Sequence, residues 1–255
     1  VFGGDGTVRE VVKGMGDDPL PVGIIPFGTV NVLALDLGIS FNPVIATATI
    51  LEGHKKKIDV GYLNDEPFLL MVSTGLDALA VHNVDLSTKR YFGQIAYVIS
   101  AIWSALTDRA GKIKITMEDQ NIQDRGYLVI ISNSRFYGGR YKIAEEIRID
   151  DGLLNVILFK KSSITDTFRL LLGVVTNRHR YMRDIAFYKG REIQVTSRTK
   201  VKVQMDGDKA PPTPIRVWVK KHHLPVIVPR NQQSQEGLEA VKTLLAHVFS
   251  PGAWT

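Results

Sequence analysis

The hydrophobic pattern of the chain changes after Lys57, and this change constrains the fold more than any other feature. Before Lys57, short apolar segments alternate with stretches of helical spacing. After it, apolar residues recur at every second position. The first pattern is typical of a doubly wound α/β sheet and the second of an antiparallel sandwich or barrel. The sequence therefore predicts an α/β region followed by an all-β region.

The α/β region is predicted to alternate strands and helices through tight glycine turns. The expected elements are a strand ending at Val1-Phe2, a helix whose apolar residues run from Val8 to Met15 and which stops at Gly16, a strand at 21–25, a helix from Thr29 to Leu37 that ends at Gly38, and a helix from Asn42-Pro43 to Gly53. A stable sheet of this kind needs more strands. We therefore expect about 60 residues, two βα units, upstream in the natural protein.

The all-β region is predicted to contain nine strands with two inserted helices. The strands are expected at 58–62, 68–73, 113–117, 127–132, 154–159, 192–196, 200–205, 215–219 and 226–228. The helices are expected at 88–106 and 165–177, and the tail from residue 232 is polar and then helical. Alternating apolar residues and turn dipeptides such as Asn64-Asp65 support the strands.

Composition excludes several classes of protein. The chain has no cysteine, so disulfides, thiolate nucleophiles and cysteine-ligated metals are ruled out. The six histidines lack metal-ligand spacing, and no Gly-x-Ser-x-Gly elbow is present. The net charge of +6 is spread out, with tight clusters at Lys55-Lys56-Lys57 and Lys220-Lys221. A mild basic excess suits a solvated surface or an anionic partner, but no nucleic-acid-binding signature accompanies it.

The segment Gly3, Gly4, Asp5, Gly6 and Thr7 is the sharpest local motif. Glycines let backbone amides approach a phosphate, and the following helix points its positive end at the same place. Asp5 could hold Mg²⁺ or orient a nucleotide hydroxyl, and Thr7 can hydrogen-bond a phosphate oxygen. An ordinary glycine-rich turn is the alternative. The segment is neither a Walker A loop nor a GxGxxG motif.

A second glycine turn follows the next predicted strand. Gly28 and Thr29 open a helix there, and glycine turns at neighbouring strand ends can frame one cleft at the carboxyl edge of a sheet. A simple helix capped by Thr29 is equally compatible with the spacing. No strong role is assigned to Asn31.

Two carboxylate clusters lie in the all-β region. Asp206-Gly207-Asp208 follows a predicted strand and could accept a proton or bind a metal, although the spacing alone favours a β-turn. Asp150-Asp151-Gly152 could bind Mg²⁺ or Ca²⁺, and here too a plain turn is the simpler interpretation.

Seven segments in order resemble the diacylglycerol kinase catalytic-domain family, especially its soluble bacterial lipid kinases. They are GGDGTVREVV, GIIPFGTVNVLALDLGI, KKIDVGYLN, STGLDALAV, ISNSRFYGG, IDDGLLNVILF and VQMDGD. The resemblance runs from Val1 to about Pro229 and implies three regions. These are a partial NAD kinase- or phosphofructokinase-like α/β nucleotide-binding domain (1–55), an antiparallel β-sandwich with inserted helices that completes the cleft (56–230), and a C-terminal helical tail (231–255).

The resemblance implies transfer of the γ-phosphoryl group of ATP to a lipid hydroxyl. Gly3 to Thr7 would match the nucleotide loop, with Gly28 and Thr29 as the second nucleotide contact. Asp151, with the carbonyls of Arg148 and Leu153, would match a structural Mg²⁺ site. Asp206-Gly207-Asp208 matches a catalytic motif that usually ends in Glu, so Asp208 would deprotonate the lipid hydroxyl. Because Asp208 stands where the motif usually has Glu, its side chain is shorter by one methylene group.

The expected partners are ATP, Mg²⁺ and a lipid such as diacylglycerol, with no nucleic acid. We expect a cytoplasmic protein with peripheral contact at the inner membrane face, and strand edges that could pair in a homodimer. Two alternatives remain. One is a non-catalytic lipid- or nucleotide-binding relative, favoured by Asp208, and the other is a NAD kinase-like enzyme with a soluble substrate.

Overall fold

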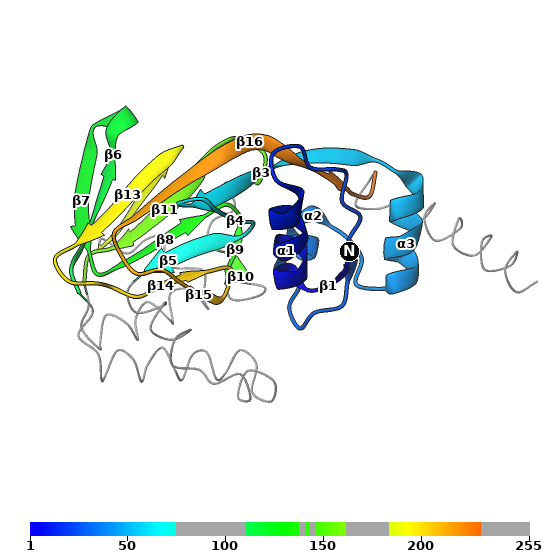
Figure 1. Ribbon diagram of the computed structural model, residues 1–255, viewed down its shortest axis with the longest axis horizontal. Coiled ribbons are helices and arrows are strands. Elements are labelled where there is room, and N and C mark those ends of the chain that lie inside the picture. The colour runs from blue at the N-terminus through cyan, green and yellow to red at the C-terminus, as the bar shows by residue number, and fades with distance from the viewer. Residues whose placement is uncertain (75–110, 138–140, 143–145, 162–183, 231–255) are drawn as a thin grey trace, which may run out of the picture. The chain divides into compact units, whose positions relative to one another are not determined.

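The computed structural model describes residues 1–74, 111–137, 141–142, 146–161 and 184–230 (Figure 1). The chain divides into two compact units. Among the described residues, one contains Val1–Ile58 and 223–230, and the other lies within Asp59–His222. The helices predicted at 88–106 and 165–177 and the tail 231–255 lie outside the described residues.

The first unit has the predicted alternation of strands and helices. Its elements are β1 (Phe2–Gly3), α1 (Asp5–Met15), β2 (Ile25–Pro26), α2 (Val32–Leu37) and α3 (Pro43–Glu52). Strands β1 and β2 pair in parallel, with Phe2 opposite Ile25. The predicted ends of all three helices are confirmed, because Gly16, Gly38 and Gly53 follow α1, α2 and α3 with positive φ angles. Asn42 caps α3 by accepting a hydrogen bond from the Val44 amide.

One of the predicted helix starts is wrong, that of α2. Helix α1 begins at Asp5, within the glycine motif expected to open it, and Gly4 is its extended N-cap residue. Helix α2 begins at Val32, and its N-cap is Asn31 rather than Thr29. Thr29 lies in an exposed bend before the helix. The Asn31 backbone is left-handed (φ 53°), a conformation that an asparagine tolerates better than a threonine.

The second unit confirms the predicted β-sandwich. One six-stranded sheet has the order β4-β3-β16-β13-β6-β7, and the other has the order β12-β11-β8-β5-β14-β15. Their bounds are β3 (Lys55–Leu63), β4 (Glu66–Phe68), β5 (Met71–Thr74), β6 (Ile113–Met117), β7 (Ile122–Gly126), β8 (Leu128–Ser132), β11 (Leu154–Phe159), β12 (Ile185–Gly190), β13 (Glu192–Ser197), β14 (Val203–Met205), β15 (Asp208–Ala210) and β16 (Ile215–Ile227). The short strands β9 (Phe136–Tyr137) and β10 (Tyr141–Lys142) form a separate pair, and a 3₁₀ turn, η1 (Glu118–Gln120), follows β6.

The core of this unit is built from alternating residues of both sheets. On β6, for example, Ile113, Ile115 and Met117 are buried while Lys114 and Thr116 are partly exposed. Residues of β8 and β11 from the other sheet join the same apolar cluster. Period-two alternation thus produces one apolar face per strand, as the sequence predicts.

Several strands differ from the prediction. The segment predicted at 68–73 is split between β4 in one sheet and β5 in the other. The two strands predicted at 215–219 and 226–228 are the single strand β16, which runs through a polar stretch and has a positive φ at His222. Strands β7, β12 and β15 are absent from the prediction. β7 and β15 are edge strands with few apolar residues, so their sequences carry little hydrophobic signal.

Gly61 on β3 supplies a test of the packing. A Cβ atom at this position would lie 2.2 Å from Cζ of the fully buried Phe68, so the ring would have to move. We expect Gly61→Ala to lower the free energy of unfolding by about 1–3 kcal/mol through overpacking. Gly14→Ala in α1 is the control, since a Cβ atom added there would meet nothing within 4 Å. Thermal melting of the two variants checks the difference, and equal melting temperatures would contradict this account.

Candidate functional site

The two predicted glycine turns lie against each other in the first unit. They follow the parallel strands β1 and β2, and the Phe27 amide donates a hydrogen bond to the Gly3 carbonyl (3.0 Å). A Cβ atom on Gly28 would lie 2.6 Å from Cα of Gly4. Only a residue without a side chain allows this approach, so the backbones of both turns are brought together at the carboxyl ends of neighbouring strands.

Asn31 holds the second turn in place. Its Oδ1 accepts a hydrogen bond from the Gly28 amide and its Nδ2 donates to the Gly28 carbonyl, both at 2.8 Å. The side chain is buried. No strong role was predicted for Asn31 from the sequence. A signal was present there, because asparagine is among the few residues that combine a left-handed backbone with local side-chain hydrogen bonds.

Asp5 links the first turn to α2. Its Oδ2 accepts a hydrogen bond from the Val32 amide (2.8 Å) and its Oδ1 accepts one from the Leu33 amide (3.0 Å). Burial raises the pKa of the Asp5 carboxyl above its ordinary value, and the two amides oppose that rise. Both oxygens therefore satisfy amides at the N-terminus of α2, where the Asn31 side chain makes no capping hydrogen bond.

The groups that remain accessible at these turns are small. Gly6, Thr7, Gly28 and Thr29 are exposed. The amides of the first turn of α1 point out of the helix start, since an α-helix leaves its first four amides without intrahelical partners. Backbone amides at the start of an 11-residue helix, beside a second glycine turn, are suited to an anionic ligand such as a phosphate.

Asp206 and Gly207 form the two-residue turn of the β14–β15 hairpin, with φ angles of 51° and 86°. The Asp206 carboxylate accepts hydrogen bonds from three consecutive amides, those of Leu69 (2.8 Å), Leu70 (2.9 Å) and Met71 (2.9 Å). The buried Gln204 side chain accepts a hydrogen bond from the Gly207 amide (2.8 Å). The turn is thus fixed on both sides.

Asp208 differs from Asp206 in its surroundings. It is the first residue of β15, lies opposite Met205 and is exposed. The predicted pair of carboxylates therefore comprises one that is bound to the backbone and one that reaches solvent from a rigid turn. Only the second has the accessibility that a general base needs.

Comparison with known proteins places the chain in a family. Residues 1–63 match the diacylglycerol kinase catalytic domain, and residues 70–228 match the YegS C-terminal NAD kinase beta sandwich-like domain. A Streptococcus pneumoniae protein, provisionally named a lipid kinase, is 31% identical over 86% of this chain and 74% of its own length. The chain belongs to the diacylglycerol kinase family. It is thus an enzyme of the lipid kinase class.

Other members are similar over most of their length. A diacylglycerol kinase of Bacillus subtilis is 25% identical over 91% of this chain and 78% of its own length. A crystal structure of a diacylglycerol kinase from Bacillus anthracis superposes with a TM-score of 0.73 at 28% identity, covering 90% of this chain and 77% of that one.

The loop at 148–153 carries the metal ligands that the sequence predicts for this chain. The fully buried carboxylate of Asp59 fixes it by accepting hydrogen bonds from the amides of Gly152 (2.5 Å) and His222 (2.7 Å). Asp151 accepts a hydrogen bond from the Leu153 amide (3.0 Å). One carboxylate and the carbonyls of Arg148 and Leu153 are hard oxygen donors, so the residues present fit Mg²⁺. In the described part of the chain, no three acidic or histidine side chains gather as a metal cluster.

The segment ISNSRFYGG, which contributes to the family resemblance, runs past the end of a described range. Tyr137 ends β9, and Gly138 and Gly139 lie outside the described residues. Within the described ranges, no helix is long and apolar enough to cross a bilayer.

The role of Asp5 can be tested without a ligand. We expect Asp5→Asn to lower stability by about 1–2 kcal/mol, because an amide offers one oxygen in place of two to the start of α2. Thermal melting of the ligand-free protein measures this effect. An unchanged melting temperature would show that Asp5 serves only a ligand.

The two carboxylates of the β-turn should behave differently. Asp206→Asn is expected to lower stability by about 2–3 kcal/mol, since a charged acceptor of three amides is lost. Asp208→Asn should change stability by less than about 0.5 kcal/mol, as expected at an exposed position. Chemical denaturation of both variants gives the comparison, and similar losses would contradict the assignment.

Proposed function

We propose that this protein is an ATP- and Mg²⁺-dependent lipid kinase that transfers the γ-phosphoryl group to a lipid hydroxyl, with diacylglycerol or a related lipid as acceptor. The observation that carries the proposal is the contact between the two glycine turns, Gly3-Gly4 and Gly28, at the ends of parallel strands. Membership in the diacylglycerol kinase family supports the class of acceptor.

The glycine turns would bind the phosphates of the nucleotide. Amides at the start of α1 donate to phosphate oxygens, and Thr7 and Thr29 add exposed hydroxyl groups. Gly3, Gly4, Gly6 and Gly28 keep side chains away from the ligand. Asp5 would act as a positioning residue, since its carboxylate holds the start of α2.

Asp208 would be the general base. Its carboxylate accepts the proton of the lipid hydroxyl as the lipid oxygen bonds to the γ-phosphorus and the bond from that phosphorus to the bridging oxygen of ADP breaks. Asp206 and Gln204 hold the turn from which Asp208 projects. A fixed turn reduces the reorganisation that proton transfer requires.

Two Mg²⁺ ions are proposed, one that acts in the reaction and one that is structural. Mg²⁺ bound with ATP supplies charge neutralisation at the β- and γ-phosphates. A second, structural Mg²⁺ would be held by Asp151 with the carbonyls of Arg148 and Leu153, on the loop that Asp59 fixes. A lipid acceptor also requires peripheral contact with a membrane surface, and we expect the protein at the cytoplasmic face.

A transfer assay tests this function. Labelled ATP and Mg²⁺ are supplied with mixed-lipid micelles, and label in the extracted lipid is measured. We expect one lipid class to be labelled, and Asp208→Asn to reduce the rate by at least about 10²-fold because the base is lost. Asp208→Glu keeps a carboxylate and tests the reach of the shorter side chain. Asp65→Asn, an exposed acid at another turn, is the control.

Two controls separate the alternatives. NAD in place of lipid tests for a soluble acceptor. Nucleotide binding is followed separately by its effect on the melting temperature. Nucleotide stabilisation without any labelled lipid would replace the kinase proposal with that of a nucleotide-binding relative. Equal activity of Asp208→Asn and Asp65→Asn would remove Asp208 as the base.

A further inference from the structure

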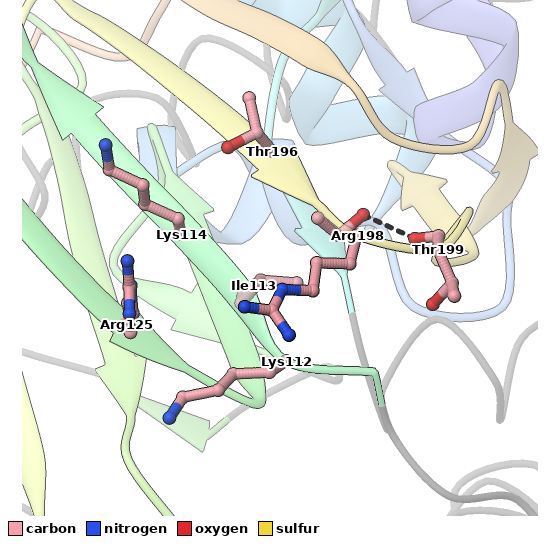
Figure 2. A pocket seen from close by; sticks show the side chains of 8 residues that line it. Lys112, Ile113, Lys114, Arg125, Thr196, Arg198 and Thr199 are labelled. Carbon is pink, nitrogen blue, oxygen red and sulfur yellow. Dashed lines mark hydrogen bonds between the residues drawn. The ribbon is translucent and has the colours of Figure 1, made fainter.

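The outer face of the β13–β6–β7 edge carries a basic pocket. This hollow of about 470 Å³ is lined by Lys112, Ile113, Lys114, Arg125, Thr196, Ser197, Arg198 and Thr199 (Figure 2). Half of these residues are cations and none is acidic. All of them belong to the second unit, Asp59–His222. The proposed catalytic and nucleotide-binding residues are not among them.

Strand register explains why the cations gather. Lys114 on β6 lies directly opposite Arg125 on β7 and opposite Thr196 on β13. Since Ile113 and Ile115 face the core, alternation puts these three side chains on the outer face. Lys112 and Arg198 lie two residues beyond Lys114 and Thr196 and continue the same face. Figure 2 shows the Arg198 guanidinium extending from the end of β13 towards β6.

This arrangement leaves positive charge uncompensated. Like charges directly opposite on neighbouring strands repel each other. The acid next to Arg125, Asp124, is already paired with Lys160 (2.8 Å) and accepts a hydrogen bond from the Tyr188 hydroxyl (2.6 Å). Within the described part of the chain, the four lining cations have no ion pair with an acid. A bound anion would relieve the repulsion.

We propose that this pocket binds a phosphate group. Arg125 and Arg198 offer guanidinium forks that match phosphate oxygens, and Lys112 and Lys114 add point charges. Thr196 and Thr199 contribute hydroxyl donors at the rim. The Ser197 hydroxyl is already used, since it donates to the Thr199 carbonyl (2.6 Å). Four cations exceed the single charge of a carboxylate, and a phosphate has more acceptor oxygens.

The phosphate could come from the headgroup of an anionic phospholipid in a bilayer or from a soluble phosphate ester. Both present the same group to the pocket, and binding assays distinguish them. Because binding is measured without ATP or turnover, failure of this proposal is distinguishable from failure of the kinase assignment.

The test uses the full chain and two pairs of substitutions. Lys114→Gln with Arg125→Gln removes two pocket charges. Lys55→Gln with Lys57→Gln removes two exposed lysines of β3 from the Lys55-Lys56-Lys57 cluster, outside the pocket, and leaves the same net charge as the pocket pair. One arm measures co-sedimentation with phosphatidylglycerol vesicles against phosphatidylcholine vesicles. The other measures binding of glycerol phosphate by calorimetry.

We expect the pocket pair to weaken binding at least tenfold in one arm and the β3 pair to change it less than twofold. Loss in the vesicle arm alone identifies the lipid headgroup, and loss in the calorimetric arm identifies a soluble phosphate. Equal loss in both pairs, or loss only in the β3 pair, would overturn the proposal, as would absence of binding in both arms.

Two further measurements keep the result interpretable. The pocket pair should melt at the same temperature as the parent chain or higher, because it removes the like-charge repulsion between β6 and β7. Arg125→Lys keeps the charge but not the fork. It should bind the same phosphate several-fold more weakly than the parent, whereas unchanged binding would show that net charge alone attracts the anion and would overturn the pocket assignment.

Discussion

The buried carboxylate of Asp59 is the interaction on which much of the second unit depends. It lies on β3 and accepts hydrogen bonds from the amides of Gly152 and His222, while the Asp59 amide donates to the Ile149 carbonyl. His222 has a positive φ, and its amide is bound by this carboxylate rather than by a backbone carbonyl. One side chain therefore joins β16 at His222 to the loop that carries Asp151. Removing an acceptor from buried amides costs more than an ordinary hydrogen bond contributes.

The same device recurs at Asp5 and at Asp206, whose carboxylates are engaged by backbone amides. Asp5 binds two amides of α2, and Asp206 binds three consecutive amides, from Leu69 to Met71. Each carboxylate joins segments that are far apart in sequence. Asp208 stands out because it is exposed beside a turn that its neighbour has already fixed. Accessibility, rather than proximity in sequence, distinguishes the acid that can take a proton from a ligand.

The sequence predicts best those features that local chemistry determines. β6 and β11 have the predicted bounds, because β6 shows clear apolar alternation and β11 is a mostly apolar run. Glycine identifies the ends of all three helices. The contact between the two glycine turns also follows from their positions after parallel strands.

The features that could not be predicted depend on distant partners. The start of α2 is set by Asn31 and Asp5, which lies 27 residues before Val32 in the chain. The three amides bound by Asp206 come from a segment more than a hundred residues away, at separations of 135 to 137. Edge strands β7 and β15 pair on one side only and need little hydrophobic pattern, so their sequences resemble loops. These elements are determined by contacts with distant parts of the chain rather than by the intrinsic secondary-structure propensity of their own residues.

The two proposed anion sites differ in how they would bind their ligands, and each suits a different task. At the glycine turns the proposed donors are backbone amides held by strands, by Asn31 and by Asp5, so they would need little reorganisation as charge developed on a transferring phosphoryl group. In the basic pocket the donors are long side chains on an open sheet face. Such side chains adapt to a ligand, and their attraction for it weakens as salt screens the charges. Catalysis demands the first kind of site, and reversible attachment to an anionic partner is better served by the second.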